Sequence, residues 1–321
     1  MQPIVADPKI QKRSNLVMVS RRASAPWRRM RRRSNTVLVA AAAIGLAPVA
    51  AHATPADLYF ERSVMAAANQ RCGLFGADLT SALESAQAQA RGAALRAGSS
   101  AQSLSGLQQR ASARASQAAC SSKDMAEAAS RVRSAFDGYA RLQRMTFPGD
   151  TADWRADRAM ADHTLIWRLI QSARFGQDSL GFGLAGQGGA SALVAVASFA
   201  DGAEPYSARL VLRDVSRAGE PCLGQAGRGL AARLPLPGAR KAYLAEARDP
   251  APARLLPAGA RSGLAFRFPR AAADALAGLD PREAVAVEFL FSGRKGESVR
   301  TAYVEVGDFA AGRAFLAAAQ R

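Results

Sequence analysis

The sequence predicts an α+β protein in which an antiparallel helical bundle precedes an antiparallel β-sandwich or barrel. Three observations support this class. No proline lies between Pro55 and Pro148, and apolar or small residues recur there every three or four positions, as on a buried helix face. From Thr164 onward, apolar residues recur at every second position, which is the period of a strand. The runs 285–291 and 299–306 flank a loop containing Ser and Gly, as in a β-hairpin.

A targeting signal precedes the bundle. Arg31, Arg32 and Arg33 stand before an uncharged apolar stretch, residues 36–47, which is too short to span a bilayer. Ala51-His52-Ala53 has the small-x-small pattern of a cleavage site. We therefore expect residues 30–53 to be a Sec signal peptide, cleaved between Ala53 and Thr54, and the protein to be periplasmic or secreted.

Alternatives to this reading of the N-terminus remain open. An uncleaved anchor or a twin-arginine export signal would use the same segment, although neither arginine pair is followed by the hydrophobic pair of twin-arginine signals. Residues 1–29 place the apolar stretch unusually far from the start. We expect Met30 to be the initiator and residues 1–29 to be a gene-start extension.

Four helices are predicted for a helical domain over residues 54–147. Pro55 suits the first position of a helix, Asp78 is a good N-cap, and Gly98 is a stop signal. A variant capping box at residues 121–124 starts the fourth helix. The first helix is expected over residues 55–71 and the second from Asp78 to Ala97, and the apolar stripes of the third and fourth helices run over 104–118 and 125–142. Short turns between them favour antiparallel neighbours.

Helix direction predicts a disulfide in this bundle. Cys72 ends the first helix and Cys120 follows the third, so both lie at the same end of an up-down-up arrangement. An exported protein folds where thiols are oxidised, and we expect a Cys72–Cys120 bond that stabilises the fold by roughly 4 kcal/mol. The third cysteine, Cys222, has no evident partner and should stay free.

Residues 148–163 are polar and rich in Asp and Arg, and we expect a linker there, with Trp154 docking on one of the domains. A β-rich domain should then cover residues 164–321. Short helices are expected at 270–279 and 309–319. The predicted strands lie at 165–170, 180–184, 193–199, 208–213, 242–247, 264–268, 285–291 and 299–306.

Composition excludes several classes of protein. The chain is 49% hydrophobic and 21% charged, unlike a disordered polyelectrolyte or a multi-span membrane protein. Residues 1–53 carry +9 of the net charge of +17, and the remaining +8 comes from arginines scattered along the chain, whereas a nucleic-acid binder clusters them on one face. We expect no nucleic-acid partner. A mildly basic envelope protein can touch an anionic membrane or cell-wall polymers peripherally.

Few residues suit catalysis. After signal cleavage His163 is the only histidine, and no Gly-x-Ser-x-Gly elbow accompanies it. We interpret it as an ordinary residue at the start of a strand rather than as a member of a catalytic triad or a zinc ligand. Glu288 and Glu305 lie on the last hairpin and are the best candidates for a glycosidase-like pair. Glu288 equally suits a surface ion pair with Arg300 across the strands. Cys222 lacks a histidine or cationic neighbour that would make it reactive.

Glycines at positions 181–189 resemble a phosphate-binding loop only superficially. They lack the Lys-Ser/Thr of a Walker motif, and no helix follows. Tight strand turns or bulges are the better interpretation. We expect no cofactor and no metal ion.

Two resemblances concern parts of the chain. Residues 89–98, between Cys72 and Cys120, resemble uncharacterised exported proteins of alphaproteobacteria, which implies an envelope origin and no activity. Residues 303–311 (Tyr-Val-Glu-Val-Gly-Asp-Phe-Ala-Ala) are similar to the end of invasion-associated locus B proteins, which are exported β-rich domains. Those domains usually carry cysteine pairs, whereas this one has Cys222 alone.

The sequence favours a non-enzymatic envelope protein that works by binding, with an envelope protein or a cell-wall component as partner. An envelope hydrolase that cleaves glycan or peptide with carboxylates of the β-rich half is the first alternative. A scaffold that oligomerises through its alanine-rich helix faces is the second. The sequence names no specific ligand and no oligomeric state.

Overall fold

The computed structural model describes residues 53–317 except Met160, Asp162, Gly189, Gln225, Ala226, Arg294 and Lys295. The predicted gene-start extension and nearly all of the predicted signal peptide lie outside these residues. Within the described part, no helix is long and apolar enough to cross a membrane. All described residues belong to one compact unit.

The first helix, α1 (Pro55–Cys72), begins at a capping box. The Thr54 hydroxyl accepts a hydrogen bond from the Asp57 N–H, and the Asp57 carboxylate accepts one from the Thr54 N–H. The helix ends at Gly73, whose φ of 62° is left-handed. The predicted cleavage point between Ala53 and Thr54 is therefore exposed and directly precedes this cap.

Three more helices follow: α2 (Ala77–Arg96), α3 (Ala101–Gln117) and α4 (Lys123–Ala135). The hydroxyls of Ser100 and Ser122 cap α3 and α4. Helix α1 packs against α2 and α3. The helical region ends earlier than the sequence predicted, because Gly138 adopts a left-handed φ of 81° and the chain then enters a strand.

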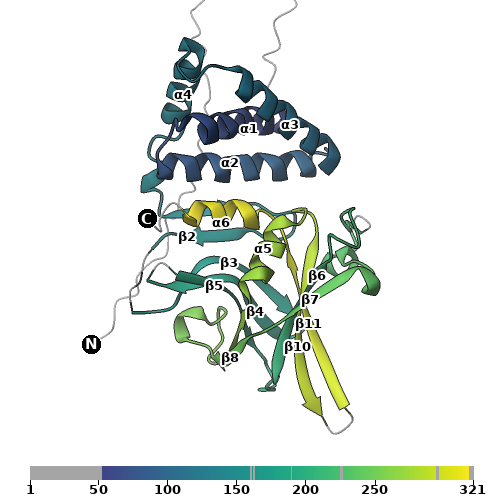
Figure 1. The fold of residues 1–321 in the computed structure, drawn as a ribbon. Helices are drawn as coiled ribbons and strands as arrows, with labels where there is room; N and C mark the ends of the chain where they lie inside the picture. Colours follow the sequence, from purple (N-terminus) through teal and green to yellow (C-terminus); the bar gives the residue numbers. More distant parts are fainter. Residues whose placement is uncertain are drawn as a thin grey trace, which may run out of the picture. The chain divides into compact units, whose positions relative to one another are not determined.

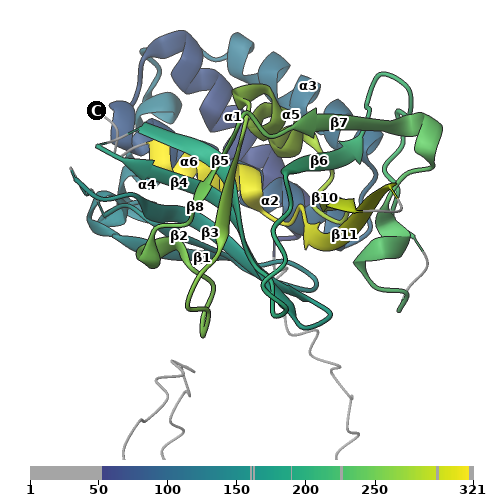
Figure 2. The same cartoon turned by 90° about the horizontal axis from the view of Figure 1, so that it is seen from below.

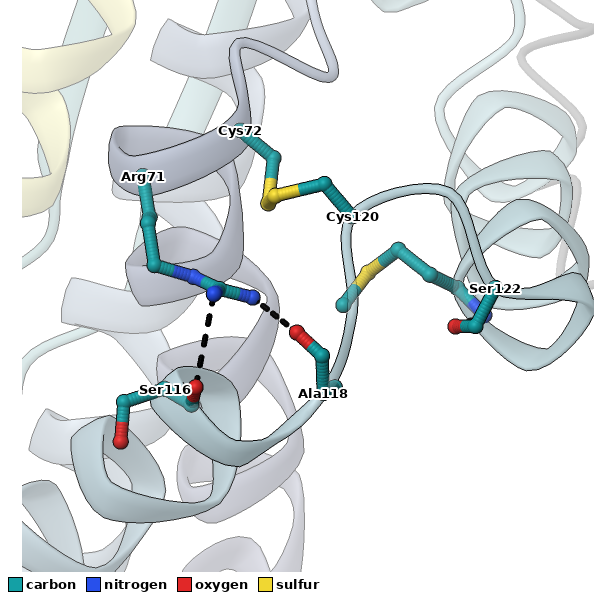
Figure 3. Close-up of a disulfide and its surroundings, with 7 residues drawn as sticks. Arg71, Cys72, Ser116, Ala118, Cys120 and Ser122 are labelled. Atoms are coloured by element: carbon teal, nitrogen blue, oxygen red, sulfur yellow. Dashed lines mark hydrogen bonds between the residues drawn. A yellow bond between two sulfur atoms is a disulfide. The ribbon is translucent and has the colours of Figure 1, made fainter.

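The disulfide prediction is confirmed. Cys72 at the end of α1 is bonded to Cys120, which follows α3, with their Cα atoms 5.6 Å apart (Figure 3). The neighbouring Arg71 donates hydrogen bonds to the carbonyls of Ser116 and Ala118 and so holds the same end of α3 (Figure 3). Cys222 is free and half-buried, as expected.

Two antiparallel sheets make up the β part. Sheet A has the order β1-β2-β3-β4-β5-β9-β8, and sheet B has the order β11-β10-β6-β7. Neither sheet closes on itself among the described residues, so the barrel alternative is wrong. The strands are β1 (Arg144–Phe147), β2 (Trp154–Asp157), β3 (Ile166–Phe175), β4 (Asp178–Gln187), β5 (Ala190–Ser198), β6 (Ser207–Arg213), β7 (Arg240–Leu244), β8 (Ala247–Pro250), β9 (Leu264–Phe268), β10 (Ala284–Gly293) and β11 (Gly296–Glu305).

Helices α5 (Arg270–Gly278) and α6 (Phe309–Ala317) cover part of sheet A. Figure 1 shows α6 between α2 and the strands, and Figure 2 shows the same arrangement from below. One core cluster contains inward-facing residues of both sheets, of α5 and of α6. The Ser85 hydroxyl of α2 donates to the Ala311 carbonyl of α6, so the helical layer is tied to the β part by buried contacts.

The segment predicted as a linker contributes a strand. β2 pairs with β1 and β3 within sheet A. Trp154 is fully buried there and donates its indole N–H to the Val306 carbonyl at 2.9 Å. Trp154 therefore docks as part of the core. Its segment belongs to sheet A and is not a separate linker.

Candidate functional site

The two predicted carboxylates do not form a catalytic pair. Glu288 on β10 stands opposite Thr301, and Glu305 on β11 stands opposite Ala284. The two are four positions apart along the strands, or about 13 Å at the rise of a β-strand. A glycosidase needs about 5–10 Å between its carboxylates.

Each carboxylate has a structural role instead. Glu288 accepts a 2.5 Å hydrogen bond from the Arg209 guanidinium on the neighbouring strand, rather than pairing with Arg300. Glu305 is fully buried and accepts backbone N–H groups of Asp150, Thr151 and Ala152 at 2.6–3.1 Å. It thereby fixes the turn between β1 and β2.

The remaining candidates lie elsewhere. His163 is exposed before β3. The Cys222 thiol donates to the Leu234 carbonyl, and the Cys222 N–H donates to Glu283. Glu283 is buried in a bidentate ion pair with Arg213, at 2.6 and 2.9 Å. Among the described residues no group of three His, Cys, Asp or Glu side chains is placed to hold a metal ion.

The most promising site is a groove on the face of sheet A that points away from the main core. Its cavity volume is about 800 Å³. It is lined by β4, β5, β8, β9 and the segment after β8, and its lining residues are Leu165, Ala185, Gly186, Gln187, Gly188, Ala190, Ser191, Ala192, Val194, Ala247, Asp249, Pro250, Pro252, Ala265 and Arg267. We call this the sheet A groove.

Small side chains explain why the groove is hollow. On β5, Leu193 and Ala195 point into the main core, so Ala192 and Val194 point to the opposite face. Directly opposite Ala192 on β4 lies Ala185, another small residue. Alanine at these positions leaves space that a larger apolar residue would fill.

The glycine run shapes one end of this groove. Gly188 has a left-handed φ of 55°, as the β4–β5 turn requires. A Cβ added at Gly186 would lie 2.0 Å from the Ala190 carbonyl oxygen, so only glycine fits there. The sequence interpretation of these glycines as strand-turn residues agrees with the structure, but it did not indicate that they border a groove.

The other wall comes from the segment after β8. The Trp167 indole N–H donates to the Leu255 carbonyl at 3.1 Å and fixes this segment on the sheet. Leu255 is fully buried among the apolar residues of the same face. The groove is therefore preformed by a rigid sheet and an anchored segment, as ligand sites usually are.

A second hollow adjoins the groove at the start of β5. Strand β9 pairs with β5 only over Leu193–Ala197, because it ends at Phe268 and the chain turns into α5. This leaves the first three residues of β5 without a strand on that side in the described structure. The hollow has a volume of about 650 Å³ and includes three arginines, Arg267, Arg270 and Arg313. We call it the arginine recess.

Sequence reasoning missed this site for a physical reason. The groove depends on which strands are neighbours, and β9 lies about seventy residues beyond β5 in the chain. One signal was present: Arg267 interrupts the otherwise apolar run of β9. A charged residue in such a strand indicates a face that is not packed against the main core.

Comparisons with known protein families, with curated proteins and with solved structures find no match. The site must therefore be interpreted from its own geometry.

Proposed function

We propose that this chain is an exported, non-enzymatic protein of the cell envelope that binds an apolar ligand in the sheet A groove. The observation that carries the proposal is the groove itself, a preformed hollow of about 800 Å³ with a largely apolar lining. Catalysis is not part of the proposal, because Glu288 and Glu305 are too far apart and both are engaged in structural contacts.

Export is supported by two independent features. The targeting pattern of residues 30–53 ends directly before the Thr54 cap, and the Cys72–Cys120 bond suits an oxidising compartment. In this proposal helices α1–α4 form a bundle that covers α6, while sheet A presents the groove on its other side.

The intact mass of the protein isolated from the periplasm should correspond to a chain starting at Thr54. A main species that retains residues 30–53 would contradict cleavage.

Binding can be tested with a neutral apolar fluorophore, N-phenyl-1-naphthylamine. We expect saturable binding of one molecule per chain, since the lining holds few groups that need hydrogen bonds. Replacing Ala192 with Phe puts a ring into the groove and should weaken binding at least about tenfold.

A matched control is Ala242→Phe. Ala242 is an exposed alanine in β7 and lies outside the groove. This variant should bind the fluorophore as the wild type does. Equal affinity of the wild type and Ala192→Phe, in folded proteins, would contradict the proposed site.

A further inference from the structure

The sheet A groove and the arginine recess adjoin at the start of β5, the groove on the outer face of sheet A and the recess on the face of the main core. They share Ala190, Ser191, Ala192 and Arg267, where β9 leaves the sheet and β5 continues. The groove is mainly apolar, with Asp249 and Arg267 as its charged lining residues, and the recess is bordered by guanidinium groups. Arg267 stands where the two adjoin and lines both.

The arginines of the recess differ in how closely a carboxylate neutralises their charge. Asp274 accepts a 2.5 Å hydrogen bond from Arg313 and lies 3.9 Å from Arg270. The side chain of Arg267 has no ion pair or hydrogen bond with any described residue, and it is exposed. Glu246 also lines the recess, so the three arginines, Glu246 and Asp274 of the recess keep a net positive charge, while Asp249 is the one carboxylate among the lining residues of the groove. An anionic group at the junction would find Arg267 available.

The lining distinguishes two kinds of elongated ligand. A peptide brings two polar backbone groups per residue, and each must be hydrogen-bonded when it is buried. The side chains along the groove are mainly methyl groups and proline rings, so away from the unpaired start of β5 it would leave many of these groups unsatisfied. An alkyl chain has no such requirement, and it gains free energy with each methylene removed from water.

We propose that the hollow binds a single-chain anionic amphiphile, with its alkyl chain in the sheet A groove and its anionic head on Arg267. A guanidinium suits a carboxylate or phosphate head because it donates two parallel hydrogen bonds. Arg270 and Arg313 add positive charge beside it. This inference rests on the proposed function and adds the chemical class of the ligand.

The test uses the mature chain with bound N-phenyl-1-naphthylamine and measures its displacement below micellar concentrations. The competitors are tetradecanoate, tetradecanol and tetradecyltrimethylammonium, which share one chain length and differ in head charge. Tetradecanoate should displace the probe at a concentration about tenfold lower than the other two. Arg267→Gln should remove this advantage, and Arg267→Lys should retain part of it.

Arg155→Gln is the matched control, because Arg155 is an exposed arginine of β2 in the same sheet, outside both hollows. It should behave as the wild type. Equal displacement by all three competitors would overturn the anionic assignment while leaving the apolar groove in place. Stronger displacement by an apolar peptide than by tetradecanoate would also overturn it. A wild type that fails to bind the neutral probe would instead refute the proposed function.

Discussion

Arg96 of α2 and Asp308, at the start of α6, form a bidentate ion pair with N–O distances of 3.0 and 2.9 Å. Asp308 is almost fully buried, whereas the Arg96 side chain keeps some exposure. Burial raises the pKa of Asp308, and the guanidinium of Arg96 opposes that rise. The helical layer and the β part are thus joined by a largely buried ion pair.

Removing Arg96 should lower the free energy of unfolding more than removing the charge of Asp308. Arg96→Met leaves a buried carboxylate without its partner, and we expect a loss of about 3 kcal/mol in the free energy of unfolding at pH 7. Asp308→Asn leaves the better-solvated guanidinium unpaired, and its loss in the free energy of unfolding should be smaller than that of Arg96→Met. Chemical denaturation of both variants measures the difference. A smaller loss for Arg96→Met than for Asp308→Asn would contradict this order.

The Arg96→Met variant should also regain stability at low pH. Without Arg96 the pKa of Asp308 rises further above its value of 3.8 in the unfolded chain. The folded state then holds a proton that the unfolded state releases, so stability falls as pH rises through this window. Unfolding measured from pH 7 down to pH 4 should show the deficit relative to the wild type shrinking. A constant deficit would exclude Asp308 as its cause.

Gly92 is required beside this ion pair. A Cβ added to Gly92 in α2 would lie 2.2 Å from an Asp308 carboxylate oxygen. Although alanine favours a helix interior by about 0.5–1 kcal/mol, we expect Gly92→Ala to destabilise the protein by about 2 kcal/mol. Gly106→Ala in α3 is the control, because its Cβ would meet nothing closer than an arginine tip at 3.5 Å. That variant should be more stable than the wild type in the same denaturation experiment.

The disulfide should stabilise the fold through the loop that it closes. The bonded cysteines are 48 positions apart, and Cys72→Ser should lower the free energy of unfolding by about 3–4 kcal/mol. Cys222→Ser should lower the free energy of unfolding only slightly, because a serine hydroxyl can keep the hydrogen bond to the Leu234 carbonyl. Non-reducing peptide mapping should give one Cys72–Cys120 pair and one alkylatable thiol. A bond involving Cys222 would contradict this assignment.

Local signals predicted four helices and the disulfide, because residues such as Pro55 and Ser122 act within one turn of the helix ends that they mark. The prediction of Asp78 as an N-cap was wrong: Gly76 holds that position, and Asp78 lies in the first turn of α2. Cys72 and Cys120 were paired from helix direction, which depends only on the count of helices between them. The strands from β3 onward were predicted except β8, because the predicted strand 242–247 runs across the break between β7 in sheet B and β8 in sheet A. The hairpin of β1 and β2 was missed because its strands are only four residues long.

Register and strand order could not be predicted in this way. The sequence interpretation set Glu288 against Arg300, but Arg300 stands opposite Phe289, one position away. A shift of one residue moves a side chain to the other face of the sheet, and Arg300 accordingly lies over the Phe199 and Phe291 rings. The sheet A groove was hidden for the same reason, since it depends on β9 lying beside β5.

The position of Arg300 leads to the last prediction. Its guanidinium binds Asp201 through two hydrogen bonds of 3.1 and 2.6 Å and also reaches Asp178 at 3.2 Å. The hydrogen bonds from Arg300 are the main cause that lowers the pKa of Asp201 from 3.8 to about 2. Because the folded pKa is depressed, the stabilisation is present above pH 3.8 and is lost as pH falls toward 2.

NMR titration of the Asp201 carboxyl carbon should therefore give a pKa of about 2 in the wild type. In Arg300→Gln the pKa should return toward its ordinary value, since the charged donor is gone. Arg174→Gln removes a nearby exposed arginine that lines the same surface hollow but makes no contact with Asp201, and it should leave the titration unchanged. If Arg174→Gln raised the pKa as much as Arg300→Gln, the general positive field of this surface, rather than the paired hydrogen bonds, would be the cause.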